Sequence, residues 1–311
     1  MIVTVTLNPC LDRTLTVPRL AVDEVIRATD ARLDWGGKGF NVSRALQALG
    51  GESLALGLVG GAAGELVARG LVGLGIPADL VPIAGETRTN TAITEAGSGR
   101  YVKVNEPGPA VQPEELAAFL ERVRAQLHPG DLWILSGSLP PGLRDDVYAR
   151  LVELVQAAGA RALLDTSGEP LRLGCAARPY LVKPNAVEAA EVTGRPVRSA
   201  ADALAAARTL LGQGIEVVAL SLGAEGLLLA SGRQGVHARP PRVQARTPVG
   251  AGDALLAGLA WALAGGLPLA EMARWGLASG TATARREGVG AGTRAEVEAL
   301  YEQVDINLVE I

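Results

Sequence analysis

The chain has 311 residues, of which 48% are hydrophobic and 20% charged, so it is long enough for one large globular domain or two smaller ones. A net charge of −4 and only 3% aromatic residues argue against a nucleic-acid partner. No apolar run reaches the ~18 residues of a membrane helix, and the first residues lack the pattern of a signal peptide, so we expect a cytoplasmic protein without a membrane partner. Cys10 and Cys175, with His128 and His237, are too few and too scattered for a disulfide framework, a CxxC site or a histidine-rich metal centre.

In chain order, the first predicted element is a strand over residues 2–7, which ends at the turn signal Asn8-Pro9. Short alternating segments follow within residues 14–35 (among them 25–28), and again over 91–95 and 101–104, where the intervening Ala-Gly-Ser-Gly is typical of a hairpin. Helical spacing begins near residue 42 and again at Pro113, and Ser199 and Thr293 stand at N-cap positions of two later helices. Short apolar strands lie between the helices, at 132–135, 162–164, 180–182 and 217–220. This alternation predicts an α/β fold with a mostly parallel sheet that helices cover on both faces.

Polar residues follow each of these short strands. They are Asn8 and Asp12, Ser136-Gly137-Ser138, Asp165-Thr166-Ser167, Lys183-Pro184-Asn185 and Ser221-Leu222-Gly223. Ligands of open α/β sheets bind outside the carboxyl ends of the strands, so we expect one composite site at this edge of the sheet. The two hairpin-like segments are candidates for a lid over that site.

The strongest chemical signal is Thr247-Pro248-Val249-Gly250-Ala251-Gly252-Asp253, which runs into an apolar stretch typical of a buried helix. A glycine-rich turn into a helix start exposes backbone N–H groups and the positive end of the helix dipole, which together attract an anion. Asp253 at that point can accept a proton from a substrate hydroxyl while the amides hold a phosphoryl group; alternatively, it only caps the helix. The sequence lacks GxxxxGK[ST] and a well-placed GxGxxG, which argues against a P-loop NTPase and a nicotinamide-dependent dehydrogenase.

Two segments resemble the signatures of the ribokinase-like (PfkB) carbohydrate kinase family: Gly36-Gly37-Lys38-Gly39-Phe40-Asn41-Val42 and Gly250-Ala251-Gly252-Asp253. Further segments, in the family's order, are similar to its phosphosugar branch: residues 6–12, 87–90, 105–109, 136–142 and 183–188. The resemblance implies a ribokinase-like fold with a small β-sheet lid. It implies a main domain over residues 1–11, 36–86 and 106–311, a lid over 12–35 and 87–105, and a homodimer that forms through the lids.

The resemblance also implies a role for each residue that matches a motif. Asp253 would be the catalytic base, and the amides of Gly250, Ala251, Gly252 and Asp253 itself would hold the transferred phosphoryl group. The sugar phosphate would contact Asp12, Gly37, Lys38, Asn41, Arg88, Asn90 and Ser138. ATP would contact Lys183, Asn185, Ser221, Gly223 and Gly226, and Mg²⁺ would be organised by Asn185 and Glu188, through water.

Several of these residues also have a plain structural interpretation. Asp12 can stabilise a turn, Lys38 can be a solvated lysine at a helix start, and Arg88 can be a surface charge. Glu188 can be a first-turn carboxylate that interacts favourably with the helix dipole. His128 and His237 match no motif of the family, and we expect both to be structural.

The activity implied by the resemblance is phosphoryl transfer from ATP to a ketohexose phosphate. Fructose 1-phosphate, giving fructose 1,6-bisphosphate, is the expected substrate, and tagatose 6-phosphate and fructose 6-phosphate are the alternatives. The phosphofructokinase-like members of this branch often have a lysine where this chain has Ala92, two residues after Asn90, and this departure bears on the choice of substrate. A non-catalytic sugar-phosphate sensor is the alternative from another class. The presence of Asp253, Asn185 and Glu188 argues against it.

Overall fold

The computed structural model describes residues 1–244, 249–286 and 290–311. Its main body is built on a ten-stranded sheet in the order β14-β13-β12-β11-β10-β9-β8-β1-β4-β5. The strands are β1 (Ile2–Thr6), β4 (Leu54–Val59), β5 (Ala78–Pro82), β8 (Leu132–Ser136), β9 (Arg161–Asp165), β10 (Leu181–Val182), β11 (Val217–Ser221), β12 (Leu227–Ser231), β13 (Gln234–Arg239) and β14 (Asp305–Glu310). Neighbours from β5 to β11 pair in parallel, whereas β12, β13 and β14 extend the sheet in antiparallel pairs.

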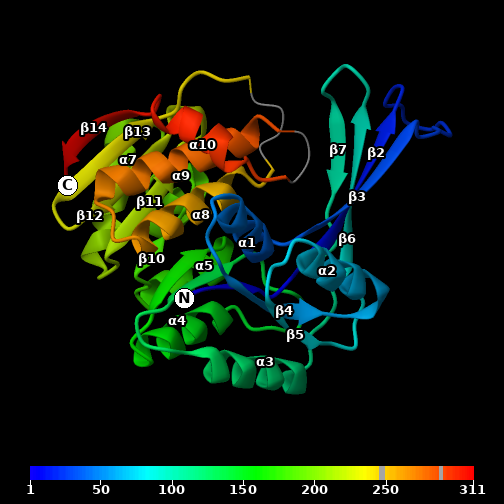
Figure 1. Cartoon of the computed structure of the whole chain (residues 1–311), viewed down its shortest axis with the longest axis horizontal. Helices are drawn as coiled ribbons and strands as arrows, with labels where there is room; N and C mark the ends of the chain where they lie inside the picture. Colours follow the sequence, from blue (N-terminus) through cyan, green and yellow to red (C-terminus); the bar gives the residue numbers. More distant parts are fainter. Residues whose placement is uncertain (245–248, 287–289) are drawn as a thin grey trace.

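Helices cover both faces of this sheet (Figure 1). One face carries α1 (Lys38–Ala48), α8 (Ala251–Ala264), α9 (Leu269–Ala284) and α10 (Arg294–Tyr301), and the other carries α3 (Pro113–Gln126), α4 (Val147–Ala157), α5 (Gly168–Ala176), α6 (Ala186–Thr193) and α7 (Ala200–Gly212). A short 3-10 helix, η1 (Gly223–Glu225), follows β11, and α2 (Gly61–Gly73) packs on β4 and on the base of a second sheet. Among the described residues, no helix is long and apolar enough to cross a membrane.

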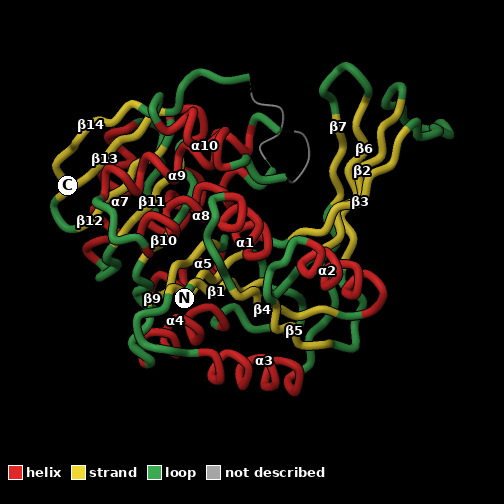
Figure 2. Tube along the Cα trace, in the orientation of Figure 1, coloured by secondary structure: helices red, strands yellow, loops and turns green. Residues whose placement is uncertain are grey.

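The second sheet is small and stands away from the main body (Figures 1 and 2). Its order is β3 (Asp30–Gly36), β2 (Cys10–Val17), β6 (Arg88–Glu95) and β7 (Tyr101–Val104). The strand pairs β2–β3 and β6–β7 are antiparallel, and β2 and β6 pair in parallel. We call these four strands the lid.

The register gives the lid a polar face and an apolar face, because side chains alternate along each strand. Asp12, Asn90 and the residues in register with them form the polar face. The apolar face includes Leu11 and Trp35, which pack against α2 at the base of the lid. It continues outward through Leu15, Leu33, Ile93, Val102 and Val104.

The predicted fold class is confirmed: a mostly parallel sheet, helices on both faces and a small separate sheet. The hairpin predicted around Ala-Gly-Ser-Gly is the β6–β7 pair, and the helix predicted from Pro113 is α3. Ser199 and Thr293 are N-caps, as expected. One expectation is wrong: residues 25–28 form no strand, because they lie in the exposed connection between β2 and β3.

Candidate active site

The polar strand ends predicted to form one site do lie at one edge of the main sheet. Strands β1, β8, β9, β10 and β11 are consecutive neighbours and run in parallel, so their carboxyl ends point the same way. This edge lies beside the lid and beside the N-terminal turns of α1 and α8.

Asp253 lies in the first turn of α8, where the helix starts after Gly250 in the left-handed conformation (φ 78°). The side chain is buried (6% exposed), and its Oδ2 accepts a hydrogen bond of 2.8 Å from the Nδ2 of Asn41 on α1. Burial raises the pKa of Asp253, although Lys38, Asn41 and Lys183 all act in the opposite direction. A carboxylate with a raised pKa, in a helix turn that lacks a side-chain cap, is suited to accept a proton. Thr247 and Pro248, which begin this motif, lie outside the described residues.

Asp165, at the end of β9, is a residue of the site to which sequence analysis gave no role. It is fully buried (1% exposed), and its Oδ1 lies 3.2 Å from the Nζ of Lys38 and 3.3 Å from the Nζ of Lys183. Burial alone would raise the pKa of Asp165, but the two ammonium groups hold it below the usual range. Asp165 therefore holds two cations from separate elements next to the first turn of α8.

The two lysines differ in their exposure. Lys183 is buried, and a Cβ atom at Gly252 would lie 3.6 Å from its Nζ, so this ammonium adjoins the first turn of α8. Lys38 is 40% exposed at the start of α1. Burial opposes its charge, but Asp165, Asp253 and Glu188 together raise the pKa of Lys38, which stays protonated. Gly37 precedes it with φ 134°, a conformation that only glycine adopts readily.

The lid contributes Asp12 and Asn90, which face each other across β2 and β6. The Nδ2 of Asn90 donates a hydrogen bond of 3.1 Å to the Oδ1 of Asp12, and the other oxygen of Asp12 lies 3.7 Å from the Sγ of Cys10. At the first position of β6, Arg88 donates to the backbone carbonyls of Glu106 (2.9 Å) and Asn8 (3.0 Å). Arg88 thus lies at the edge of the site, with two of its N–H groups directed to the backbone.

Ser138 is exposed after β8 and accepts a hydrogen bond of 3.2 Å from the Nδ2 of Asn8. Asn8 is buried and also contacts the carbonyl of Pro107 at 3.0 Å, so it connects three loops at the base of the lid.

Asn185 and Glu188 form a capping box at the start of α6. This contact supports the structural interpretation of Glu188 as a carboxylate that stabilises the first turn of its helix. The Oδ1 of Asn185 accepts from the backbone N–H groups of Val187 and Glu188, and the Oε2 of Glu188 accepts from the N–H of Asn185. Both lone pairs of the amide oxygen are therefore occupied, and only the NH₂ of Asn185 can reach a ligand. The donor set still suits a hydrated Mg²⁺, because the second oxygen of Glu188 can hold a coordinated water.

Of the remaining residues assigned to ATP, Ser221 is the last residue of β11 and Gly223 begins η1, next along the same edge. The Oγ of Ser221 donates a hydrogen bond of 3.4 Å to the carbonyl of Pro184. Gly226 has a structural role as well, because a Cβ atom there would lie 2.0 Å from the carbonyl oxygen of Ala238. The Nε2 of His237 donates a hydrogen bond of 3.1 Å to the carbonyl of Glu225, in keeping with a structural role.

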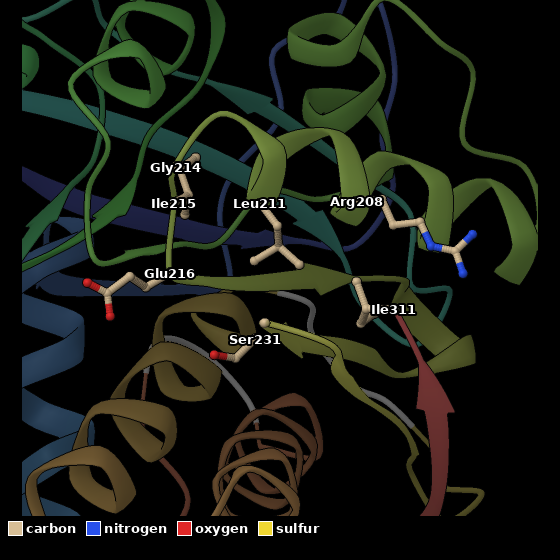
Figure 3. A pocket seen from close by; sticks show the side chains of 8 residues that line it. Arg208, Leu211, Gly214, Ile215, Glu216, Ser231 and Ile311 are labelled. Atoms are coloured by element: carbon tan, nitrogen blue, oxygen red, sulfur yellow. The ribbon is translucent and has the colours of Figure 1, made fainter.

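A hollow of about 680 Å³ lies elsewhere on the molecule (Figure 3). Glu216 and Ser231, which line it, flank the amino end of β11, whereas Ser221 is at the carboxyl end. Its other lining residues come from α7, the connection to β11, the turn between β12 and β13, and the C-terminus, among them Arg208, Gly232 and Ile311. This hollow is therefore not part of the candidate site.

Together, the site combines a buried carboxylate, a helix N-terminus and two ammonium groups held by a second carboxylate. These are the parts that phosphoryl transfer to a hydroxyl needs: a base for the hydroxyl proton, and positive groups for the transferred phosphoryl. The fold and the site thus define a small-molecule kinase.

Comparison with known proteins agrees with this class. The model of the pfkB family carbohydrate kinases matches residues 5–296. A relative from Xanthomonas campestris pv. campestris, named 1-phosphofructokinase, is 43% identical over 266 residues, covering 84% of this chain and 83% of its own length. A second relative with the same name, from Rhodobacter capsulatus, is 40% identical over 274 residues, which cover 88% of this chain and 87% of the relative. The crystal structure of phosphofructokinase-2 from Escherichia coli with potassium matches with a TM-score of 0.93 at 31% identity, covering 97% of this chain and 98% of that one. The chain belongs to the pfkB family of carbohydrate kinases.

Proposed function

We propose that this protein transfers the γ-phosphoryl group of ATP to the 6-hydroxyl of fructose 1-phosphate, giving fructose 1,6-bisphosphate and ADP. The observation that carries the proposal is the buried Asp253, oriented by Asn41 at the N-terminus of α8, with the Lys38 and Lys183 ammonium groups beside it. The choice of substrate rests on the relatives from Xanthomonas campestris and Rhodobacter capsulatus, which are named 1-phosphofructokinase.

In this mechanism Asp253 accepts the proton of the 6-hydroxyl while that oxygen forms a bond to the γ-phosphorus. The bond between the γ-phosphorus and the bridging oxygen of ADP breaks, and its electron pair stays on ADP. The first amides of α8 and the two lysines stabilise the negative charge on the phosphoryl oxygens. Asp165 holds both ammonium groups in place.

Mg²⁺ supplies further neutralisation of the ATP phosphates when it is bound. Glu188 is the residue that would hold its waters, and the NH₂ of Asn185 would donate to a phosphate oxygen or to one of those waters. Asp12, held by Asn90, would accept hydrogen bonds from the sugar hydroxyls. Arg88 would approach the sugar phosphate with the N–H groups that do not contact backbone.

We propose that the protein is a homodimer in which the lids of two copies cover each other. The outer part of the apolar lid face is exposed to solvent: Leu33 is 51% exposed, Val102 is 51% exposed and Val104 is 61% exposed. A four-stranded sheet with one unburied apolar face is not stable alone in water, so a second lid is the simplest cover. A cytoplasmic location stays a prediction.

An ADP-release assay with purified protein, ATP and Mg²⁺ tests the activity, with fructose 1-phosphate, fructose 6-phosphate, tagatose 6-phosphate and fructose compared side by side. We expect a clear preference for fructose 1-phosphate. Preference for a 6-phosphate would keep the mechanism and change the substrate. Turnover of fructose alone would overturn the role given to the sugar phosphate, and no ADP release with any sugar would favour a sensor.

The role of Asp253 is tested by Asp253→Asn, which should lower kcat by about 10²–10⁴, as expected for loss of a general base. Binding of fructose 1-phosphate should remain, because the asparagine still accepts the hydrogen bond from Asn41. Asp305→Asn, on β14 at the far side of the sheet, is the matched control. Near-normal turnover by Asp253→Asn would assign the base to another group.

A further inference from the structure

The chain contains only three lysines, although it has 29 basic residues in total, so the other 26 are arginines. Two of the lysines, Lys38 and Lys183, meet at Asp165 in the candidate site. The third, Lys103, lies on β7 of the lid and has no role in the mechanism above.

The strand register places Lys103 directly opposite Ala92, in the antiparallel pair of β6 and β7. Directly opposite residues project from the same face of a sheet, with Cβ atoms about 4.5–5.5 Å apart. Ala92 is two residues after Asn90, so it shares the polar face of the lid with Asn90 and Asp12. Lys103 therefore projects from the face that carries the sugar-binding residues.

The charge of Lys103 also acts at the base of the lid. Burial raises the pKa of the Cys10 thiol to about 12, and the charges of Arg88 and Lys103 act in the opposite direction. Cys10 is at the base of the lid, whereas Thr14, four residues further along β2, is in register with Ala92. The ammonium of Lys103 is thus near enough to the base of the lid to act on Cys10.

The other cations of this face are already engaged. Arg32, in register with Thr14, forms an ion pair of 2.7 Å with Asp34, and Arg88 donates to two backbone carbonyls. Lys103 is exposed and forms no hydrogen bond or ion pair with any described residue. Asp12 and Asp34 bring negative charge to the same face, so a dianionic ligand there needs an unpaired cation.

We propose that Lys103 binds the phosphate group of the sugar substrate and that it fills, from the neighbouring strand, the position of the lysine missing at residue 92. This inference rests on the proposed function, since it concerns the substrate of the same site. It makes Lys103 a specificity residue, which separates phosphorylated from unphosphorylated ketohexoses without touching the reacting hydroxyl.

The test compares Lys103→Met and Lys103→Arg with the wild-type enzyme, by steady-state kinetics and by calorimetric binding of fructose 1-phosphate. We expect Lys103→Met to raise KM and Kd for fructose 1-phosphate about 10-fold to 100-fold, the effect of removing one charge-assisted hydrogen bond. The change in kcat should be smaller, because the contact is the same in the ground state and in the transition state. Lys103→Arg should recover part of the affinity.

The double variant Ala92→Lys/Lys103→Met moves the ammonium across the strand pair and should restore most of the affinity that Lys103→Met loses. Arg100→Gln is the matched control, because it removes a positive charge from the same hairpin at a residue paired with Glu95. It should leave KM unchanged.

A KM for Lys103→Met within about twofold of the wild-type value would overturn the inference, provided that the wild type phosphorylates fructose 1-phosphate. A loss that neither Lys103→Arg nor the double variant restores, together with a lower Tm, would assign a structural role instead and overturn it as well. A wild-type enzyme inactive on every phosphosugar would overturn the proposed function itself, and is seen before any variant is made.

Discussion

As the proposed base, Asp253 must be ionised to accept a proton, so we expect its pKa to set the acid limit of the reaction. Burial raises this pKa above the usual aspartate value of about 3.9. As pH falls through the raised pKa, the carboxylate gains a proton and kcat is lost. We therefore expect the acid limb of the pH–kcat profile to lie above the range of an ordinary aspartate.

Asn41→Leu tests this assignment, because it removes the amide that donates to the Asp253 carboxylate. The charged form then loses a hydrogen bond, the pKa of Asp253 rises further, and the acid limb should move to higher pH. At high pH, where Asp253 is ionised in both proteins, kcat should recover. Gln47→Leu, the same change on α1 at an amide that contacts the carbonyl of Leu74, should not move the profile. An unmoved acid limb in Asn41→Leu would mean that another group titrates.

Single residues were predictable where a motif pointed to them and unpredictable where their role depends on partners. Asp253 and Lys38 stand in recognisable glycine-rich segments, and the structure brings them together. Asp165 was visible only as the last residue of a strand, since Asp-Thr-Ser is also an ordinary turn sequence. Its importance arises from two ammonium groups that β10 and α1 bring to it. The backbone contacts of Arg88 depend in the same way on loops distant in sequence.

The start of α6 has a structural role and a proposed functional one, because Asn185 caps the helix and is also proposed to help organise Mg²⁺. Two variants of Asn185 separate these roles. Asn185→Ser keeps a good N-cap and removes the amide, whereas Asn185→Ala removes both. We expect Asn185→Ala to lose about 1 kcal/mol of stability, or about 2 °C in Tm. Asn185→Ser should keep its Tm but require more Mg²⁺ for half-maximal activity.

The N-cap of α7 gives the control for this comparison. Ser199→Ala removes a cap of the same kind, where the serine accepts from the N–H of Asp202, and should lower Tm without changing the Mg²⁺ requirement. A normal Mg²⁺ requirement in Asn185→Ser would leave Asn185 with the capping role alone.

Among the elements, five of the seven parallel strands were predicted, because each is a short apolar run, whereas β4 (Leu54–Val59) and β5 (Ala78–Pro82) were not. The predicted strand at 217–220 is observed at Val217–Ser221, for example. The antiparallel extension by β12, β13 and β14 was not predicted, and its outermost strand, Asp305–Glu310, mixes exposed polar and apolar residues. The parallel pairing of β2 with β6 was also missed. Local patterns cannot show it, because Asp12 and its partner Asn90 are far apart in sequence.

At the scale of the whole molecule, the proposed dimer makes a direct prediction about the lid. Val102→Asp places a charge in the apolar face that the second lid would cover, so it should shift the protein to a monomer in sedimentation velocity. Activity should fall as the dimer is lost, because the lid that the dimer stabilises carries Asp12 and Asn90, the proposed sugar-binding residues. Val72→Asp, at an exposed valine on α2, is the control and should remain a dimer. A wild-type monomer at micromolar concentration would contradict the proposal.

The position of β1 inside the main sheet affects how the chain can fold. Its first residues pair with β8, and the ammonium of Met1 forms an ion pair of 2.6 Å with Asp131, which is 130 residues further along the chain. During synthesis, one edge of β1 stays open until β8 has emerged, and an open strand edge is a template for pairing with other chains. Parallel pairing over such a distance is also slow. Refolding of this kinase should therefore be slow and should give less native protein as the concentration rises.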